Sequence, residues 1–238
     1  MITTALVAAV AVGLGALAQS VTGIGFALLR APVLIEVLGR PEAVRVTVLL
    51  STVLNIAILS RHLRDVRIWN ALLLAVPTVL AMPVLAALLA NVQGKPLEVS
   101  AGVAIVAAAI VLATGLRWER ASGKLGATVA GVASAAMITV AGISGPPSIL
   151  YAANARWPTA AFRSTLQAYF LVLNLVAMAT LGLPTWGSGV VPTAFLGLIA
   201  GALTGGVMVS RVNEQWVRWC VLALAASGGT AIAIHAAF

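Results

Sequence analysis

The chain has 238 residues, of which 61% are hydrophobic and only 8% are charged, and its mean hydropathy is +1.09. Soluble domains carry roughly a quarter charged residues, so this composition excludes a soluble protein and indicates a polytopic membrane protein. The net charge of +8 comes from Lys and Arg in short loops, which is how membrane proteins set their orientation, and it does not indicate nucleic-acid binding.

The first half of the chain is predicted to form a series of apolar helices with one early interruption. The first segment contains Ala16-Leu17-Ala18, a pattern that signal peptidase cleaves, but no Lys or Arg precedes it, so we interpret it as a retained helix. A Gly-rich break at Thr22-Gly23-Ile24-Gly25, here called the first break, precedes a short helix. The helices expected in this half are Ile2–Ser20, Phe26–Leu38, Ala43–Ser60, Trp69–Ala90 and Pro96–Gly115.

The second half repeats this plan around a second break, Gly142-Ile143-Ser144-Gly145-Pro146-Pro147. Glycine and proline do not extend a helix comfortably, yet both flanking segments are apolar. Unpaired backbone groups at membrane depth persist only where they line a cavity or are buried in protein. The segments expected in this half are Leu125–Val140, a short Pro147–Ala155, Thr159–Leu181, Val190–Ser210 and Trp219–Phe238.

An offset of 119 residues relates the two halves. Val21–Gly25 corresponds to Val140–Ser144, and Val53-Leu54-Asn55 recurs as Val172-Leu173-Asn174. A shared offset together with similar breaks indicates an internal repeat rather than chance matches. We therefore divide the chain into a first transmembrane repeat at residues 1–116, a cytoplasmic linker at 117–124 and a second repeat at 125–238.

The basic loops predict the orientation of the chain. Loops rich in Arg at residues 61–67, 117–124 and 211–218 belong in the cytoplasm by the positive-inside rule. Counting spans from these loops puts the turn at 40–42 outside and the turn at 156–158 inside, so the halves are inverted. The expected fold is an all-α polytopic membrane protein. It has about eight hydrophobic segments in two inverted repeats, each with a broken helical hairpin that is either re-entrant or two crossings. Many secondary transporters share this plan.

Paired Gly-rich breaks, each followed by proline, resemble those of the TauE/SafE family of sulfite exporters and related permeases. The residues that carry the resemblance are Gly23-Ile24-Gly25 leading to Ala31-Pro32-Val33-Leu34, and the second break. Phe26, Ala27 and Ser144 depart from glycines that the family usually shows. The resemblance covers nearly the whole chain and implies outward transport of small sulfur-containing anions, sulfite or organosulfonates.

Two facing helix starts would suit an anion, because a helix N-terminus offers unpaired N–H groups and a positive dipole end. The alternative is that the glycines only allow close helix packing. Asn55 and Asn174, well inside their helices, either bind substrate or form hydrogen bonds between helices. The candidate substrate-binding residues are Gly23, Gly25, Arg30, Asn55, Gly142, Ser144, Gly145, Ser148 and Asn174.

Three arginines near the predicted breaks each have two possible roles. Arg45 and Arg163 lie about one turn inside their helices, where they either attract substrate from each side or extend to the lipid headgroups. Arg30, in the short helix after the first break, either binds substrate or pairs with Glu36.

The predicted function is a secondary transporter for small anions that exports sulfite or organosulfonates by alternating access around the two breaks. The chain's only Asp, Asp65, lies in a loop, so no proton coupling is expected. Efflux of an anion from a negative interior is already favoured by about 2.3 kcal/mol per charge per 100 mV. The alternatives are an anion channel, a transporter of another small solute, or a structural protein.

Enzyme activity is not expected. The two histidines, His62 and His235, make no acid–base cluster, and no catalytic or metal motif appears in the sequence. We therefore predict no cofactor, no metal and no nucleic acid. The predicted partners are a small anionic substrate and the lipid bilayer of a bacterial inner membrane, with homodimer formation left open.

Overall fold

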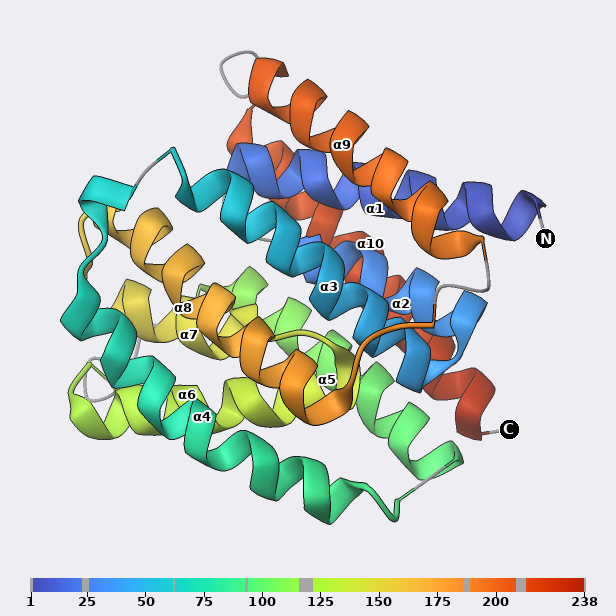
Figure 1. The fold of residues 1–238 in the computed structure, drawn as a ribbon, viewed down its shortest axis with the longest axis horizontal. Helices are drawn as coiled ribbons and strands as arrows, with labels where there is room; N and C mark the ends of the chain where they lie inside the picture. The colour runs from blue at the N-terminus through green and yellow to red at the C-terminus, as the bar shows by residue number, and fades with distance from the viewer. Residues whose placement is uncertain are drawn as a thin grey trace.

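The computed structural model describes residues 2–22, 26–61, 63–92, 94–115, 122–185, 189–208 and 213–237. In these ranges the chain is helical and contains no strand (Figure 1). The elements are α1 (Ile2–Thr22), α2 (Phe26–Leu38), α3 (Arg40–Leu59), the short 3₁₀ helix η1 (Leu63–Asp65), α4 (Ile68–Leu89), α5 (Lys95–Thr114), α6 (Lys124–Ala141), α7 (Gly145–Asn154), α8 (Thr159–Leu181), α9 (Val190–Met208) and α10 (Glu214–Ala237).

Eight of the described helices are long and apolar enough to cross a membrane. A crossing needs about 20 residues, whereas α2 has 13 residues and α7 has 10. These two short helices follow the two breaks. The all-α polytopic fold with eight apolar segments is therefore confirmed, with α1–α2 and α6–α7 as the two interrupted pairs.

The described helices follow the same order in both halves: one long, one short, then three long. Equivalent helices meet, since α3 packs on α8 and α5 packs on α10. The halves also exchange partners, because α1 packs on α9 while α6 packs on α4. In Figure 1 the connection from α2 to α3 lies at one end of the molecule and that from α7 to α8 lies at the other. We call the end that holds residues 63–67 the basic end.

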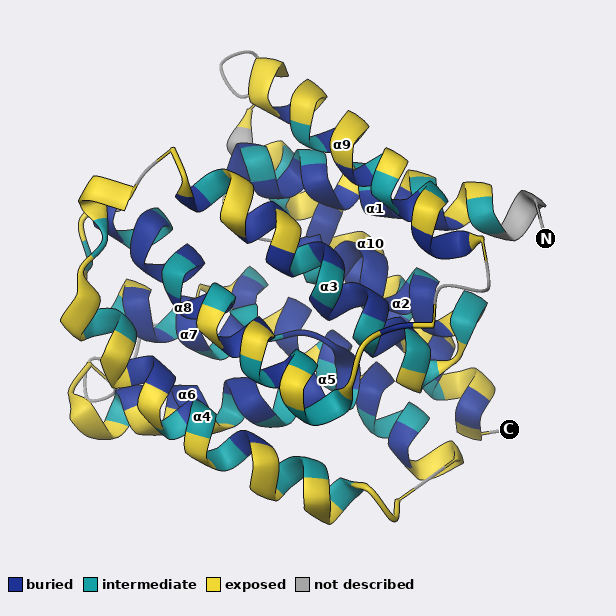
Figure 2. Ribbon diagram, viewed as in Figure 1, coloured by how far each residue is buried: buried dark blue, intermediate teal, exposed yellow. Residues whose placement is uncertain are grey.

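Burial separates a protein-facing centre from an apolar outer surface (Figure 2). Helix α2 is buried along most of its length, whereas only 22% of the spanning window of α4 and 33% of that of α9 is buried. Large apolar side chains such as Leu80 and Leu196 are exposed on these outer helices. They suit contact with lipid tails, which are as apolar as leucine.

Small residues allow α1 and α9 to approach closely. A Cβ added at Gly197 would overlap the carbonyl of Ala9, and one added at Gly201 would overlap that of Gly13. Such small-residue contacts let backbones pack together where the hydrophobic effect gives no drive between helices. Close packing is therefore the role of these glycines outside the breaks.

Most predicted helix ends lie within a few residues of the observed ones, and α10 is the exception. It begins at Glu214, not at Trp219, so the prediction of a loop at 211–218 was wrong from residue 214 onward. Asn213 explains the earlier start, because its Oδ1 accepts the N–H of Gln215 at 2.9 Å and thereby satisfies a donor of the first turn. Of the predicted linker, residues 117–121 lie outside the described part of the chain.

Candidate functional site

The second break begins where Gly142 ends helix α6. This residue has a φ of 70°, a left-handed conformation that glycine adopts without strain. Its N–H bonds to the carbonyl of Ile138 at 2.9 Å. Helix α7 then starts at Gly145, and its next two residues, Pro146 and Pro147, carry no N–H. Ser144 precedes α7 without a side-chain capping bond, which leaves the helix start uncapped by its own N-cap residue.

The first turns of α2 and α7 meet at one small cavity, here called the site cavity. Its volume is about 40 Å³, and a water molecule needs roughly 10–15 Å³ by this measure, so it holds about three waters or one small ion. A side chain at Gly145 would reach Ile149 and Phe170, two other lining residues, so glycine keeps this wall open. The lining residues are Gln19, Phe26, Ala27, Leu28, Ser51, Asn55, Ile143, Ser144, Gly145, Pro146, Ile149, Phe170 and Asn174.

The polar groups of the site cavity come from both halves. Asn55 of α3 and Asn174 of α8, the pair related by the 119-residue offset, both line it and are 3% and 2% exposed. The Nδ2 atom of Asn174 has no hydrogen-bond partner among the described residues. A buried donor without a partner costs about 1–3 kcal/mol, so this amide is available to an oxygen atom of a bound molecule.

Arg30 lies directly behind the wall of the site cavity and is fully buried. Its Nη2 donates to the carbonyl of Thr47 at 2.6 Å and to Ser51 Oγ at 2.5 Å. Its guanidinium carbon lies 3.4 Å from the ring centroid of Phe26, a cation–π contact. Ser51 and Phe26 both line the cavity, so they separate the charge of Arg30 from the cavity by one layer of atoms.

The charge of Arg30 is not balanced by a carboxylate in the described part of the chain. Its Nε and Nη1 atoms are buried there without a hydrogen-bond partner. Glu36, the alternative partner, is exposed and lies 3.4 Å from His235 Nδ1, so the pairing of Arg30 with Glu36 is wrong. An isolated buried ion costs several kcal/mol, and a bound anion would offset that cost.

Four of the predicted substrate-binding residues line the site cavity: Asn55, Ser144, Gly145 and Asn174. Gly142 and Ser148 do not line the cavity, although each is next in sequence to a residue that does. The Ser148 hydroxyl donates to the carbonyl of Gly145 at 2.9 Å. Gly23 and Gly25 lie outside the described residues.

Ser51 was missed as a site residue, although the sequence carries a signal for it. Thr47, Ser51 and Asn55 follow one another at intervals of four residues along α3, and this spacing puts them on one face of a helix. All three take part in the site, Thr47 through its carbonyl to Arg30 and the other two as lining residues.

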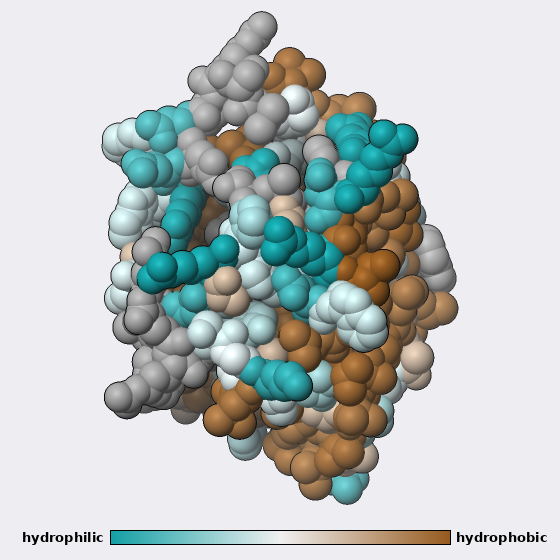
Figure 3. Space-filling view, turned by 90° about the vertical axis from the view of Figure 1, so that its left-hand side faces the viewer, coloured by the Kyte–Doolittle hydropathy of each residue, from teal (hydrophilic) through white to brown (hydrophobic). Residues whose placement is uncertain are grey.

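A larger cavity of about 290 Å³, here called the vestibule, lies toward the basic end. Gln19 lines both the vestibule and the site cavity. Arg163 lines the vestibule, and its Nη2 donates to the carbonyl of Val21 at 3.2 Å. The vestibule is lined by Gln19, Ser20, Ile58, Leu59, Arg61, Arg163, Ser164, Gln167, Ala202 and Gly206. Figure 3 looks onto the basic end, where hydrophilic side chains gather.

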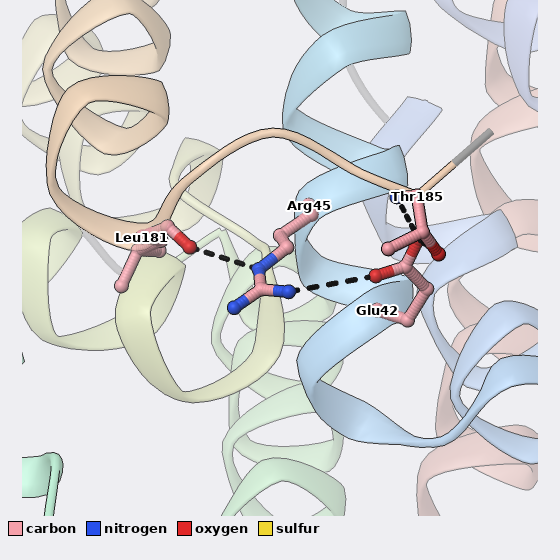
Figure 4. A network of polar contacts seen from close by, with 4 residues as sticks. All are labelled: Glu42, Arg45, Leu181 and Thr185. Carbon is pink, nitrogen blue, oxygen red and sulfur yellow. Dashed lines mark hydrogen bonds and ion pairs between the residues drawn. The ribbon is translucent and has the colours of Figure 1, made fainter.

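A polar network at the opposite end, here called the latch, ties α3 to the end of α8 (Figure 4). Arg45 Nε donates to the carbonyl of Leu181 at 2.8 Å, and its Nη1 lies 3.7 Å from Glu42 Oε2. Glu42 Oε1 accepts the N–H of Thr185 at 2.6 Å and its hydroxyl at 2.8 Å. Arg45 and Arg163 thus occupy different settings, since Arg45 is held in the latch and Arg163 lines the vestibule.

Eight helices long and apolar enough to cross a membrane, with a small cavity at the starts of two short helices, indicate a polytopic membrane protein with the plan of many transporters. Residues 7–232 match the model of a protein family that is described as sulfite exporter TauE/SafE. The chain therefore belongs to the TauE/SafE family, which is a family of membrane transporters and not of enzymes. Neither the curated proteins nor the solved structures contain a match.

Proposed function

We propose that this chain is a secondary transporter that exports small sulfur-containing oxyanions across a bacterial inner membrane. The observation that carries the proposal is the buried charge of Arg30, which has no carboxylate partner among the described residues and adjoins the site cavity. An anion in the cavity would supply the missing negative charge. The N-terminal turn of α2, the N–H of Gly145 at the start of α7 and the free Nδ2 of Asn174 would donate to its oxygen atoms.

The size of the site cavity favours sulfite over organosulfonates. A volume of about 40 Å³ suits an ion of four heavy atoms, whereas an organosulfonate adds a carbon chain. The apolar wall formed by Phe26, Ile149 and Phe170 excludes water from one side of the ion and strengthens its attraction to Arg30. We therefore propose sulfite as the main substrate.

The two ends of the molecule support loading of the substrate from the cytoplasm, which export requires. The positive-inside rule puts the basic end, with Arg61, Arg64 and Arg67, in the cytoplasm. The vestibule then opens the site toward the cytoplasm while the latch holds the outer end together. If the halves are inverted repeats, opening the latch and closing the vestibule would give the outward-facing state. A carrier needs such an alternation, whereas a channel needs a continuous path.

The test is sulfite efflux from proteoliposomes that contain purified wild-type protein or a variant. Arg30→Gln should abolish efflux, because the substitution removes the charge that balances the anion. Thr52→Val is the matched control, since Thr52 is buried on α3 next to Ser51 and does not line the site cavity. Its hydroxyl bonds to the carbonyl of Val48 at 2.8 Å and weakly to Met178 Sδ at 3.8 Å. Efflux through Arg30→Gln at the wild-type rate would overturn the proposal.

A further inference from the structure

Gln19, near the end of α1, contacts the start of α2 across the first break. Its Oε1 accepts the N–H of Phe26 at 3.2 Å. Phe26 is the first residue of α2, so this N–H is one of the donors that the helix cannot satisfy itself. The Gln19 side chain therefore caps α2 from a position seven residues before that helix begins.

Gln19 also lies between the site cavity and the vestibule. It is the residue shared by the linings of the site cavity and the vestibule in the described part of the chain. Its side chain is buried, with 6% exposed. A direct path from the vestibule to the site cavity therefore runs past this amide.

The starts of α2 and α7 differ in whether a side chain caps them. Ser144, before α7, makes no side-chain capping bond, and because Pro146 and Pro147 carry no N–H, the donor that the first turn of α7 can offer an anion is the N–H of Gly145. The start of α2 is occupied by a neutral amide oxygen in the position that an oxyanion oxygen would take. Position 138, which corresponds to Gln19 at the 119-residue offset, is Ile138 and offers no amide.

We propose that Gln19 is the inner gate of the transport path, a residue whose amide oxygen holds the α2 N–H in place of substrate and releases it when an anion arrives from the vestibule. The proposal rests on the proposed function, because it takes a sulfur oxyanion as the molecule that displaces the amide. Under this proposal Gln19 sets both the affinity for sulfite and the rate at which sulfite moves between the vestibule and the site cavity. Gln19 thereby competes with the substrate instead of binding it.

Two substitutions should act in opposite directions on sulfite binding, measured with radiolabelled sulfite on purified protein. Gln19→Glu puts a carboxylate at the start of α2, near the buried charge of Arg30, and should weaken sulfite binding at least tenfold. Gln19→Ala removes the competing oxygen and should tighten binding at least twofold while sulfite dissociates faster into the vestibule.

A second readout reports directly on the hydrogen bond between Gln19 and the Phe26 amide. Hydrogen exchange at the Phe26 amide should be faster in Gln19→Ala than in wild type without anion, and sulfite should restore protection. Thr139→Val is the control, since Thr139 is buried beside the second break and its hydroxyl bonds only to the carbonyl of Ala135 in the described contacts, while the bond from Arg40 goes to its backbone carbonyl, which the substitution keeps. It should leave sulfite affinity and Phe26 exchange within twofold of wild type.

The outcomes separate the two proposals. If the wild type binds sulfite and Gln19→Ala weakens binding, or leaves Phe26 exchange unchanged, Gln19 is a packing residue and the inner gate is refuted while the transport function stands. If the wild type binds no sulfite, the proposed function and the gate both fail. Opposite effects of the two substitutions on affinity would support the gate.

Discussion

Removing Arg45 should release the latch and favour the state that is open at the latch end and closed at the basic end. Arg45 donates to the carbonyl of Leu181 at 2.8 Å, and a hydrogen bond from a charged group contributes about 1.5–3 kcal/mol. Its ion pair with Glu42 spans 3.7 Å at a partly exposed site and adds less than about 1 kcal/mol. Since every 1.4 kcal/mol is about tenfold, a loss of about 2 kcal/mol in Arg45→Gln should shift the conformational equilibrium roughly 30-fold.

Spin-label distances can measure this shift in lipid. One pair of labels at Pro41 and Leu183 would span the latch, where both residues are exposed. A second pair at Ser60 and Pro158 would span the basic end, again at exposed positions. The exposed native Cys220 would first be replaced by Ala. In Arg45→Gln the first distance should lengthen and the second should shorten.

The control is Arg64→Gln, which removes the same charge from an exposed position of η1 at the basic end. It should leave both distance distributions as in wild type. Unchanged distances in Arg45→Gln would refute the latch as the element that holds the outer end together. Lengthening at both ends would point to loss of packing and would also contradict the reasoning.

Three further predictions concern single positions. Asn174→Leu removes a buried donor without a described partner, so the thermal stability of the ligand-free protein should rise by about 1–3 kcal/mol while sulfite binding weakens. Gly201→Leu should prevent folding in a detergent melting assay, because a side chain there overlaps α1, whereas Gly206→Leu should fold, because Gly206 faces open space. Gly142→Ala should lower stability by about 1–2 kcal/mol through its φ of 70°, and a wild-type melting temperature would contradict that origin.

The repeat was the most informative feature of the sequence. It paired Asn55 with Asn174, and these residues line the same cavity although 119 positions separate them. Both breaks were expected from glycine and proline, because those residues act through local backbone geometry. The second break bears this out with the positive φ of Gly142.

Other features depended on contacts between distant segments. The bonds from Arg30 to α3 come from tertiary packing, and no local pattern favoured them over a nearby Glu36. The matched arginines suggested two equal access points, but one conformation gives Arg45 and Arg163 different partners. Clustered charge at 211–218 favoured a loop, whereas the cap from Asn213 starts α10 within that segment.

The most direct test of the central claim is anion binding to purified wild-type protein and to Arg30→Gln. Thermal stability would be followed with sulfite, sulfate, sulfoacetate and chloride in turn. A ligand at 100 times its Kd stabilises the folded state by about 2.7 kcal/mol, so sulfite should raise the melting temperature of the wild type and not that of Arg30→Gln. Equal stabilisation of both proteins by sulfite, or stabilisation by none of the anions, would contradict an anion site completed by Arg30.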